Sequence, residues 1–147
     1  VLFQAGLAEE IGWRGFGLPA LQQRYSALTS SIILGVVWTF WHFHPANYPF
    51  LAPLAPWYVV NTISLTVVMT WLFNNTRGSL LIAVLFHTAS NVSDWIVPVM
   101  PTIASASGVR PFIIQAALVC LTALAVLIIN GPENLSRRHG RSAQVTG

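Results

Sequence analysis

The chain has 147 residues, too few for more than one ordinary domain. Charged residues make up 7% of it and apolar residues 54%, with a mean hydropathy of +0.64; a typical soluble domain has about 25% charged residues. Seven arginines and no lysines outweigh four acidic residues, but they stand between apolar runs. This composition excludes an ordinary soluble domain and a nucleic-acid-binding protein, and indicates a membrane protein.

Five apolar runs are separated by polar, proline and glycine breaks, and a short interfacial helix is expected after the first run, from Pro19. The pattern predicts an all-α fold, a polytopic bundle of about five membrane helices. The chain opens inside an apolar stretch without a basic region or a cleavage site, so we expect a first helix truncated at residue 1 rather than a signal peptide. The runs are residues 1–17, 27–44, 57–73, 80–99 and 112–129.

The domain boundaries follow from the same pattern. Residues 8–130 are predicted to form one membrane domain, and the polar tail 131–147 is predicted to be disordered. If each run crosses once, six arginines share one side and Arg110 lies on the other. The positive-inside rule then places the arginine-rich loops and the tail in the cytoplasm of a bacterial cell. The six are Arg14, Arg24, Arg77, Arg137, Arg138 and Arg141.

Two adjacent carboxylates lie inside the first run. Glu10 and Arg14 are four residues apart, so they share a helix face and can form an ion pair, whereas Glu9 is turned about 100° away. An ionisable group inside a membrane costs a few kcal/mol or more and needs a partner or a function. We therefore expect Glu10 and Arg14 to support the site and Glu9 to be available for chemistry. The alternative is an ordinary ion pair at a solvated helix end.

Histidines mark the second and fourth runs. His42 and His44 face roughly opposite directions at the end of the second run, so at most one should point at the glutamates. The other would be an interfacial histidine. His87 and Asn91 share one face of the fourth run. The alternative for this pair is interhelical hydrogen bonding that holds the bundle together.

These residues suit peptide hydrolysis, which needs an activated water, a proton carrier and a stabiliser for the oxyanion. Glu9 is the candidate base, His42 could share its water, and His87 with Asn91 offers donors for an oxyanion hole. A zinc site is the competing interpretation, because Glu9, His42 and His87 could hold Zn²⁺ with an open position. The chain lacks the H-E-x-x-H spacing of common zinc proteases, and we prefer a mechanism without a cofactor.

Three segments resemble, in order, the motifs of the CPBP family, which comprises CAAX proteases and bacteriocin-processing enzymes and is also called Abi or type II CAAX prenyl endopeptidase-like. The segments are AEEIGWRGFGLPALQ at 8–22, WTFWH at 38–42 and HTASN at 87–91. The resemblance covers residues 8–94. The second motif of the family usually has Phe where this chain has Trp38.

The resemblance implies an all-helical intramembrane endopeptidase acting on a membrane-associated protein or a prenylated CAAX-type peptide. By this resemblance Glu9 and His42 activate water, and His87 and Asn91 hold the oxyanion. The Glu10–Arg14 pair would support the site. The implied partners are the lipid bilayer and a peptide or protein substrate, with no nucleic acid.

Several alternatives stay open. His44 fits the spacing of the second motif as well as His42 does. A zinc protease would use the same residues as ligands. A non-catalytic membrane protein for bacteriocin self-immunity or scaffolding could retain the motifs, and transporters or proton relays also place Glu and His inside membranes.

Overall fold

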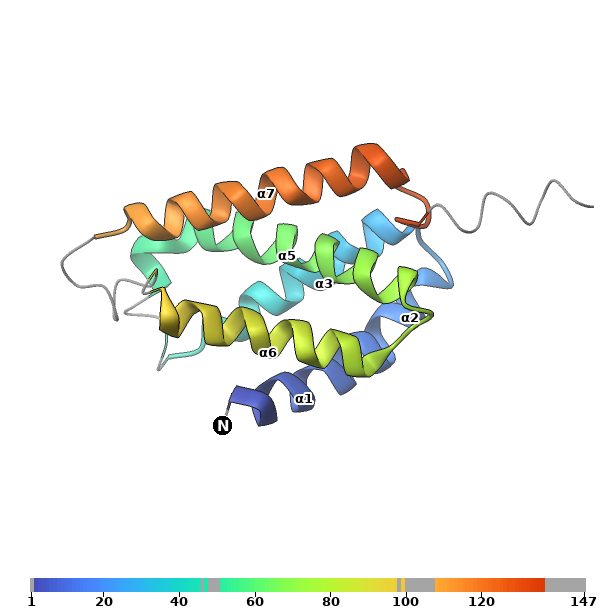
Figure 1. The fold of residues 1–147 in the computed structure, drawn as a ribbon, viewed down its shortest axis with the longest axis horizontal. Coiled ribbons are helices and arrows are strands. Elements are labelled where there is room, and N and C mark those ends of the chain that lie inside the picture. Colours follow the sequence, from blue (N-terminus) through green and yellow to red (C-terminus); the bar gives the residue numbers. More distant parts are fainter. Residues whose placement is uncertain (1, 46, 48–50, 98, 100–107, 137–147) are drawn as a thin grey trace, which may run out of the picture.

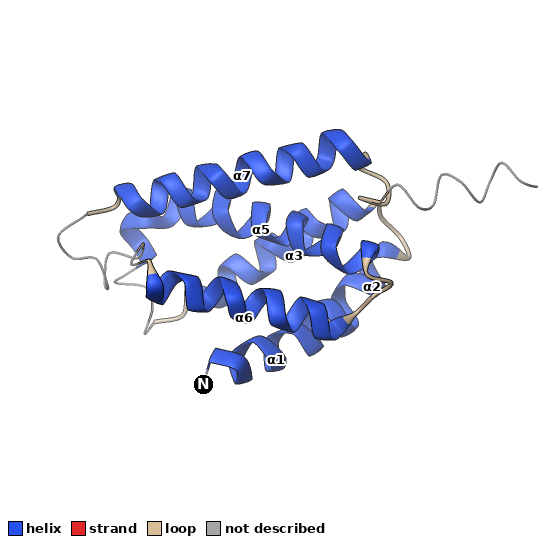
Figure 2. Cartoon of the chain, viewed as in Figure 1, coloured by secondary structure: helices blue, strands red, loops and turns tan. Residues whose placement is uncertain are grey.

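The computed structural model describes residues 2–45, 47, 51–97, 99 and 108–136. These residues form helices and connecting turns, with no strand among them (Figures 1 and 2). The predicted all-helical class is therefore confirmed. The elements are α1 (Leu2–Gly12), η1 (Trp13–Gly17), α2 (Leu18–Gln22), α3 (Ala27–His42), η2 (Ala52–Leu54), α5 (Ala55–Asn75), α6 (Leu80–Ile96) and α7 (Arg110–Asn130).

The first helix continues past its expected end. We expected a short separate helix from Pro19, and α2 lies there, but the π-helical segment η1 joins α1 to it without a break. In this segment the Leu18 N–H donates to the carbonyl of Trp13, five residues earlier. In a regular α-helix the proline ring clashes with the carbonyl four residues before it. The wider π turn accommodates Pro19, and π turns of this kind are frequent at functional sites.

Helix α5 holds the bundle together. It packs against α3, α6 and α7, and α1 packs against α6, so α1 and α7 lie at opposite edges (Figure 1). Serine caps begin two of the neighbours. Ser26 Oγ accepts from the Thr29 N–H at the start of α3, and Ser79 Oγ accepts from the Ile82 N–H at the start of α6. These caps fix where the two helices that carry His42 and His87 begin.

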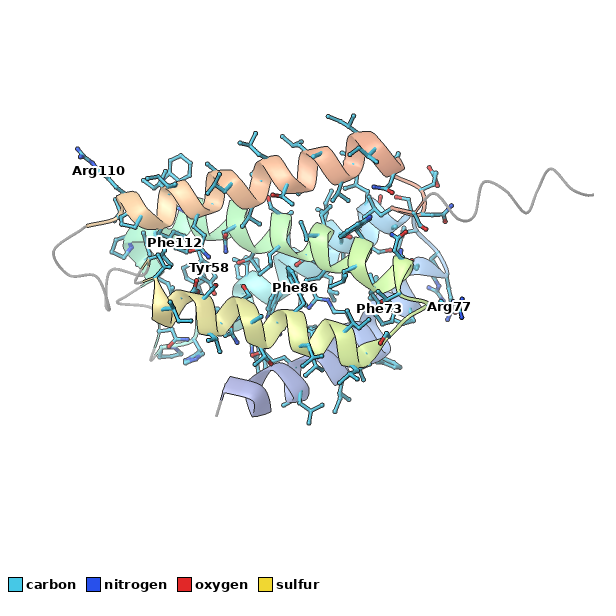
Figure 3. All side chains as sticks on the ribbon, in the orientation of Figure 1. Tyr58, Phe73, Arg77, Phe86, Arg110 and Phe112 are labelled. Carbon is cyan, nitrogen blue, oxygen red and sulfur yellow. The ribbon has the colours of Figure 1, made fainter. Side chains whose placement is uncertain are left out.

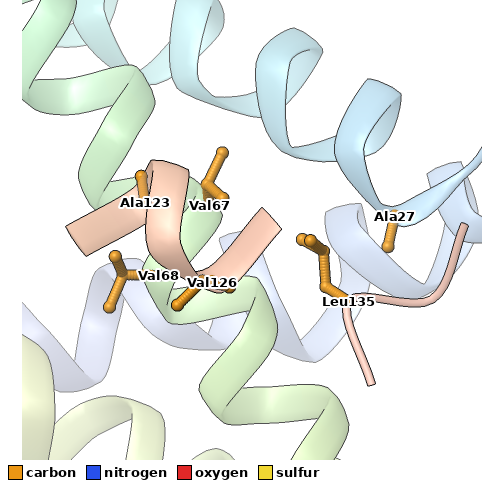
Figure 4. Packing of buried hydrophobic residues seen from close by; sticks show 6 residues of the cluster. All are labelled: Ala27, Val67, Val68, Ala123, Val126 and Leu135. Atoms are coloured by element: carbon orange, nitrogen blue, oxygen red, sulfur yellow. The ribbon is translucent and has the colours of Figure 1, made fainter. Parts of the chain in front are cut away.

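Small and hydroxylated residues let α3 and α5 approach closely. A Cβ atom at Gly35 would lie 2.9 Å from the Cα of Ile63, and Ser31 Oγ donates to Thr70 Oγ1 at 2.8 Å. Membrane helices commonly associate through such contacts. An apolar cluster joins α3, α5, α7 and the segment after α7 (Figure 4); its members are Ala27, Val67, Val68, Ala123, Val126 and Leu135.

Gly35→Ala is expected to destabilise the protein by about 1–3 kcal/mol, because the added methyl group overpacks the contact with Ile63. Gly12→Ala is the matched control, since a Cβ atom there meets nothing within 4 Å and alanine favours helix by up to about 1 kcal/mol. Thermal unfolding in detergent measures both. A Gly35→Ala variant as stable as the Gly12→Ala variant would contradict the close packing of α3 on α5.

The outer surface of the bundle is apolar. The stretches Ala52–Asn75 and Arg110–Asn130 are long and apolar enough to cross a membrane. Helix α3 has 16 residues, about 24 Å at 1.5 Å per residue, and is shorter than a hydrocarbon core of about 30 Å. Helix α7 leaves side chains such as Leu121 and Ile128 exposed. Exposed apolar side chains of this kind suit contact with lipid.

The loop arginines lie at both ends of the bundle, but Arg14 is not one of them. Arg24 and Arg77 are exposed in turns, and Arg77 and Arg110 lie at opposite ends (Figure 3). Arg14 is fully buried. Counting it among the loop arginines was therefore wrong, because its charge is used inside the protein. The three arginines of the tail lie outside the described residues.

The chain stays packed beyond α7. Gly131, at φ +75°, turns it back, and the carbonyl of Glu133 accepts from the Ala27 N–H at 2.7 Å. Asn75 Nδ2 donates to the carbonyl of Leu135 at 2.9 Å, and the Leu135 side chain is fully buried. The start of α3 has N–H groups without helical partners, and the segment 131–136 supplies carbonyls for them. This part of the tail is thus ordered, contrary to our expectation; residues 137–147 lie outside the described residues.

Candidate active site

Glu10 and Arg14 form the expected ion pair. Arg14 Nη1 lies 2.8 Å from Glu10 Oε1, and both side chains are fully buried. The same oxygen lies 2.8 Å from His87 Nδ1, which connects α1 to α6. A carboxylate only accepts hydrogen bonds, so His87 Nδ1 carries a proton and donates it. Glu10 is therefore held by two donors, and His87 keeps Nε2 for another partner.

The neighbouring Glu9 has different partners. Its Oε2 accepts from Trp38 Nε1 at 2.7 Å and from Trp13 Nε1 at 3.4 Å. Its Oε1 makes no hydrogen bond with any described residue. One carboxylate is thus neutralised by a cation, whereas the other is held by neutral indole donors through a single oxygen. The Glu10–Arg14 contact is the one that the i,i+4 spacing predicted.

His42 is fixed in the last turn of α3. Its Nδ1 lies 2.9 Å from the carbonyl oxygen of Trp38, so Nδ1 donates and Nε2 of the neutral ring is an acceptor. The ring packs against Trp38 and Tyr58, with centroids 5.6 and 5.8 Å apart. His44, its rival in the sequence, is exposed beyond the end of the helix.

The structure brings the four proposed reactive residues to one cavity of about 120 Å³. Glu9 comes from α1, His42 from α3, and His87 and Asn91 from α6. His44 is not among the lining residues. The remainder of the wall comes from α3, α5, α6 and α7: Trp38, Tyr58, Asn61, Thr62, Leu65, Ser90, Asp94, Phe112 and Gln115.

Several of these residues were missed from the sequence. Tyr58 and Phe112 stack with centroids 6.0 Å apart and close the cavity between α5 and α7 (Figure 3). Asn61 Oδ1 and Gln115 Oε1 are buried and have no hydrogen-bond partner among the described residues. A polar amide inside an otherwise apolar run was the available signal for Asn61 and Gln115. Nothing local distinguishes Tyr58 or Phe112 from ordinary packing aromatics.

The side chains present do not fit the zinc alternative. No three His, Cys, Asp or Glu side chains within the described ranges converge so that they could hold a metal ion. His87 Nδ1 binds Glu10 and His42 Nδ1 binds the backbone of α3, so each ring has only Nε2 left for a further ligand. We therefore derive no step that passes through a metal.

A larger apolar groove of about 720 Å³ adjoins the cavity. It runs between α6 and α7 over α5, and Phe86 and Leu118 are among its lining residues. A hydrogen bond of 3.1 Å from Gln115 Nε2 to Asp94 Oδ1 spans its boundary with the cavity. Four residues line both spaces: Leu65, Ser90, Asp94 and Gln115. The polar cavity and the apolar groove therefore share one wall.

Comparison with known proteins agrees with the motifs. The family described as type II CAAX prenyl endopeptidase Rce1-like matches residues 1–93. The CAAX prenyl protease 2 of Methanococcus maripaludis is 30% identical over 129 residues, which cover 81% of this chain and 47% of that protein. The chain thus spans about half the length of this relative. No solved structure matches it.

Proposed function

Since the chain belongs to the Rce1-like type II CAAX prenyl endopeptidase family, as its three motifs suggested, we propose that it is an intramembrane endopeptidase. One observation carries the proposal. Glu9, His42, His87 and Asn91, which lie on three different helices, line a single cavity inside an apolar bundle. Peptide hydrolysis needs these group types in reach of one bound carbonyl.

Glu9 and His42 suit the activation of water. Glu9 Oε1 has no hydrogen bond to any described residue, and His42 Nε2 is an acceptor, so one water can donate a hydrogen bond to each. As its oxygen attacks the carbonyl carbon of the scissile bond, Glu9 takes the proton. The C–N bond then breaks, and Glu9 returns the proton to the leaving amine. Both steps use the one carboxylate oxygen that the indole donors leave free.

His87 and Asn91 suit the stabilisation of the oxyanion. Because His87 Nδ1 already donates to Glu10, His87 can donate to substrate only when Nε2 also carries a proton. An imidazolium beside a buried carboxylate gives a strong, preorganised donor.

Asn91→Ala is expected to lower kcat by about 10²–10³-fold with little change in KM, the usual cost of removing one oxyanion-hole donor. Asn130→Ala makes the same chemical change at the far end of α7, where Asn130 donates to the carbonyl of Val126 in its own helix, and should leave kcat unchanged. Cleavage of a membrane-anchored peptide by the purified protein in liposomes measures both. An Asn91→Ala enzyme with wild-type kcat would remove Asn91 from the oxyanion hole.

The apolar groove supports a substrate that carries a lipid tail or an apolar segment next to its scissile bond. A peptide carbonyl in the cavity places the adjoining part of the substrate at the shared boundary. A prenyl chain lying along α6 and α7 would bury apolar surface at about 25 cal/mol per Å². The relative named above is a CAAX prenyl protease, and we propose the same substrate class for this chain.

Ala89→Trp is expected to raise KM for a prenylated peptide by about tenfold, because the indole fills part of the groove that Ala89 lines; tenfold corresponds to about 1.4 kcal/mol. The cleavage of an unprenylated peptide should change much less. Ala125→Trp is the matched control on α7, exposed and outside the groove. Equal effects of Ala89→Trp on both peptides would place the prenyl chain elsewhere.

The orientation in the membrane is also a proposal. Arg24 and Arg77 lie in exposed turns, Arg77 at one end of the bundle and Arg110 at the other (Figure 3). We place the loops of Arg24 and Arg77 in the cytoplasm, because the two arginines on that side outnumber the one on the other side.

A further inference from the structure

Trp38 contacts several residues of the site at once. The side chain is 4% exposed, and its N–H donates to Glu9 at 2.7 Å. Its backbone carbonyl accepts from His42. Its ring makes edge contacts with the rings of His42 and His87, with centroids 5.6 and 5.2 Å apart. One residue therefore contacts groups from α1, α3 and α6.

The indole N–H decides which oxygen of Glu9 is free. At 2.7 Å the bond to Oε2 has the length of a charge-assisted hydrogen bond, whereas the bond from Trp13 to the same oxygen is 3.4 Å long. Together they hold Oε2 and leave Oε1 without a hydrogen bond from the described part of the chain. A phenylalanine at position 38 would fill similar space without a donor. The donor is therefore the specific contribution of tryptophan at this position.

The face of the indole acts on the second carboxylate through Arg14. The Arg14 Cζ lies 5.0 Å from the centroid of the Trp38 ring, within the range of a cation–π interaction. Arg14 Nε and Nη2 are buried and have no hydrogen-bond partner among the described residues. An arginine with spare donors would attract Glu9 if nothing held either group. The indole binds both, so Arg14 stays with Glu10.

We propose that Trp38 is a positioning residue for Glu9. Its N–H anchors Oε2 so that Oε1 faces the water of the cavity, and its ring face keeps Arg14 on Glu10. The inference rests on the proposed function, because positioning matters only if Glu9 is the base. The hydrogen bond itself does not depend on that function, so it can be tested separately.

The kinetic test compares Trp→Phe variants. Trp38→Phe should lower kcat about 10- to 100-fold, the cost of losing a hydrogen bond to a charged group, with KM within about twofold of wild type. Trp13→Phe should lower kcat less, because the hydrogen bond from Trp13 to Glu9 is longer. Trp57→Phe is the matched control, since Trp57 is 42% exposed and lies outside the cavity. Wild-type kcat in Trp38→Phe, or a change confined to KM, would overturn the proposal.

The spectroscopic test needs no activity. In protein labelled with ¹⁵N-tryptophan, each of the six indole signals is assigned from single Trp→Phe variants, so Trp38 can be found by elimination even if its own variant does not fold. Glu9→Gln should shift the Trp38 signal most and leave that of Trp57 in place. An unmoved Trp38 signal would disprove the anchoring contact. If the signal shifts but the protein cleaves no peptide, the contact between Trp38 and Glu9 is supported and the protease function is refuted.

Discussion

Glu9→Gln is expected to lower kcat by about 10²–10⁴-fold, the usual contribution of a general base. Glutamine keeps the length of the side chain, and its carbonyl oxygen can still accept the Trp38 N–H. It cannot take a proton from water, so the loss should appear in kcat while the fold remains intact. Cleavage of a prenylated, membrane-anchored peptide in liposomes, together with thermal unfolding, measures both properties.

Glu133→Gln is the matched control for this variant. Glu133 is exposed after α7 and contributes its backbone carbonyl rather than its carboxylate to packing. Its replacement should leave kcat and stability unchanged. Equal rates for wild type and Glu9→Gln would remove Glu9 as the base. They would also favour the non-catalytic reading, in which the motifs are retained for immunity or scaffolding.

Arg14→Met is expected to destabilise the protein by about 3–5 kcal/mol, because it leaves a buried carboxylate without its cation. Both members of the Glu10–Arg14 pair are fully buried, so water cannot compensate for the loss. The double variant Arg14→Met with Glu10→Gln should recover much of that stability, since it removes both charges at once. Denaturant unfolding in detergent measures the three proteins.

Arg24→Met is the control, since Arg24 is exposed in the turn after α2, and it should change stability by less than about 0.5 kcal/mol. If Arg14→Met were as stable as Arg24→Met, the buried pair would contribute nothing to the fold. If the double variant were no more stable than Arg14→Met alone, the lost stability would come from packing against Trp38 rather than from an unpaired charge.

What the sequence predicted well depends on local geometry. The Glu10–Arg14 pair lies on one helix, and the i,i+4 rule is enough to find it. The contact of Glu10 with His87 joins residues 77 positions apart, so it depends on how α1 packs against α6. Helical spacing places His87 on a face but does not choose its partner.

The two histidines of the second run show the same limit. Both His42 and His44 fit the motif, and spacing does not separate them. In the structure α3 ends at His42, whose ring is fixed by the carbonyl of Trp38 and lines the cavity. The position at which α3 ends therefore favours His42 over His44. That position depends on tertiary contacts that no local sequence pattern reveals.

The wrong expectations also have physical causes. Glycines and Pro19 usually end a helix, but a π turn absorbed the proline and carried the chain into α2. The tail was read as disordered because it is polar. Its first residues are instead held by N–H groups at the start of α3 and by Asn75, partners that become visible only once the helices are assembled.

We propose that Glu9 directs water onto a peptide bond inside the membrane. The most direct test of this claim is mass analysis of a prenylated, membrane-anchored peptide after incubation with the purified protein in liposomes in ¹⁸O-water. We predict one internal cut, with one ¹⁸O atom in the new carboxylate, and an intact peptide with Glu9→Gln. An intact peptide with the folded wild-type protein, or the same labelled product from both proteins, would contradict the claim.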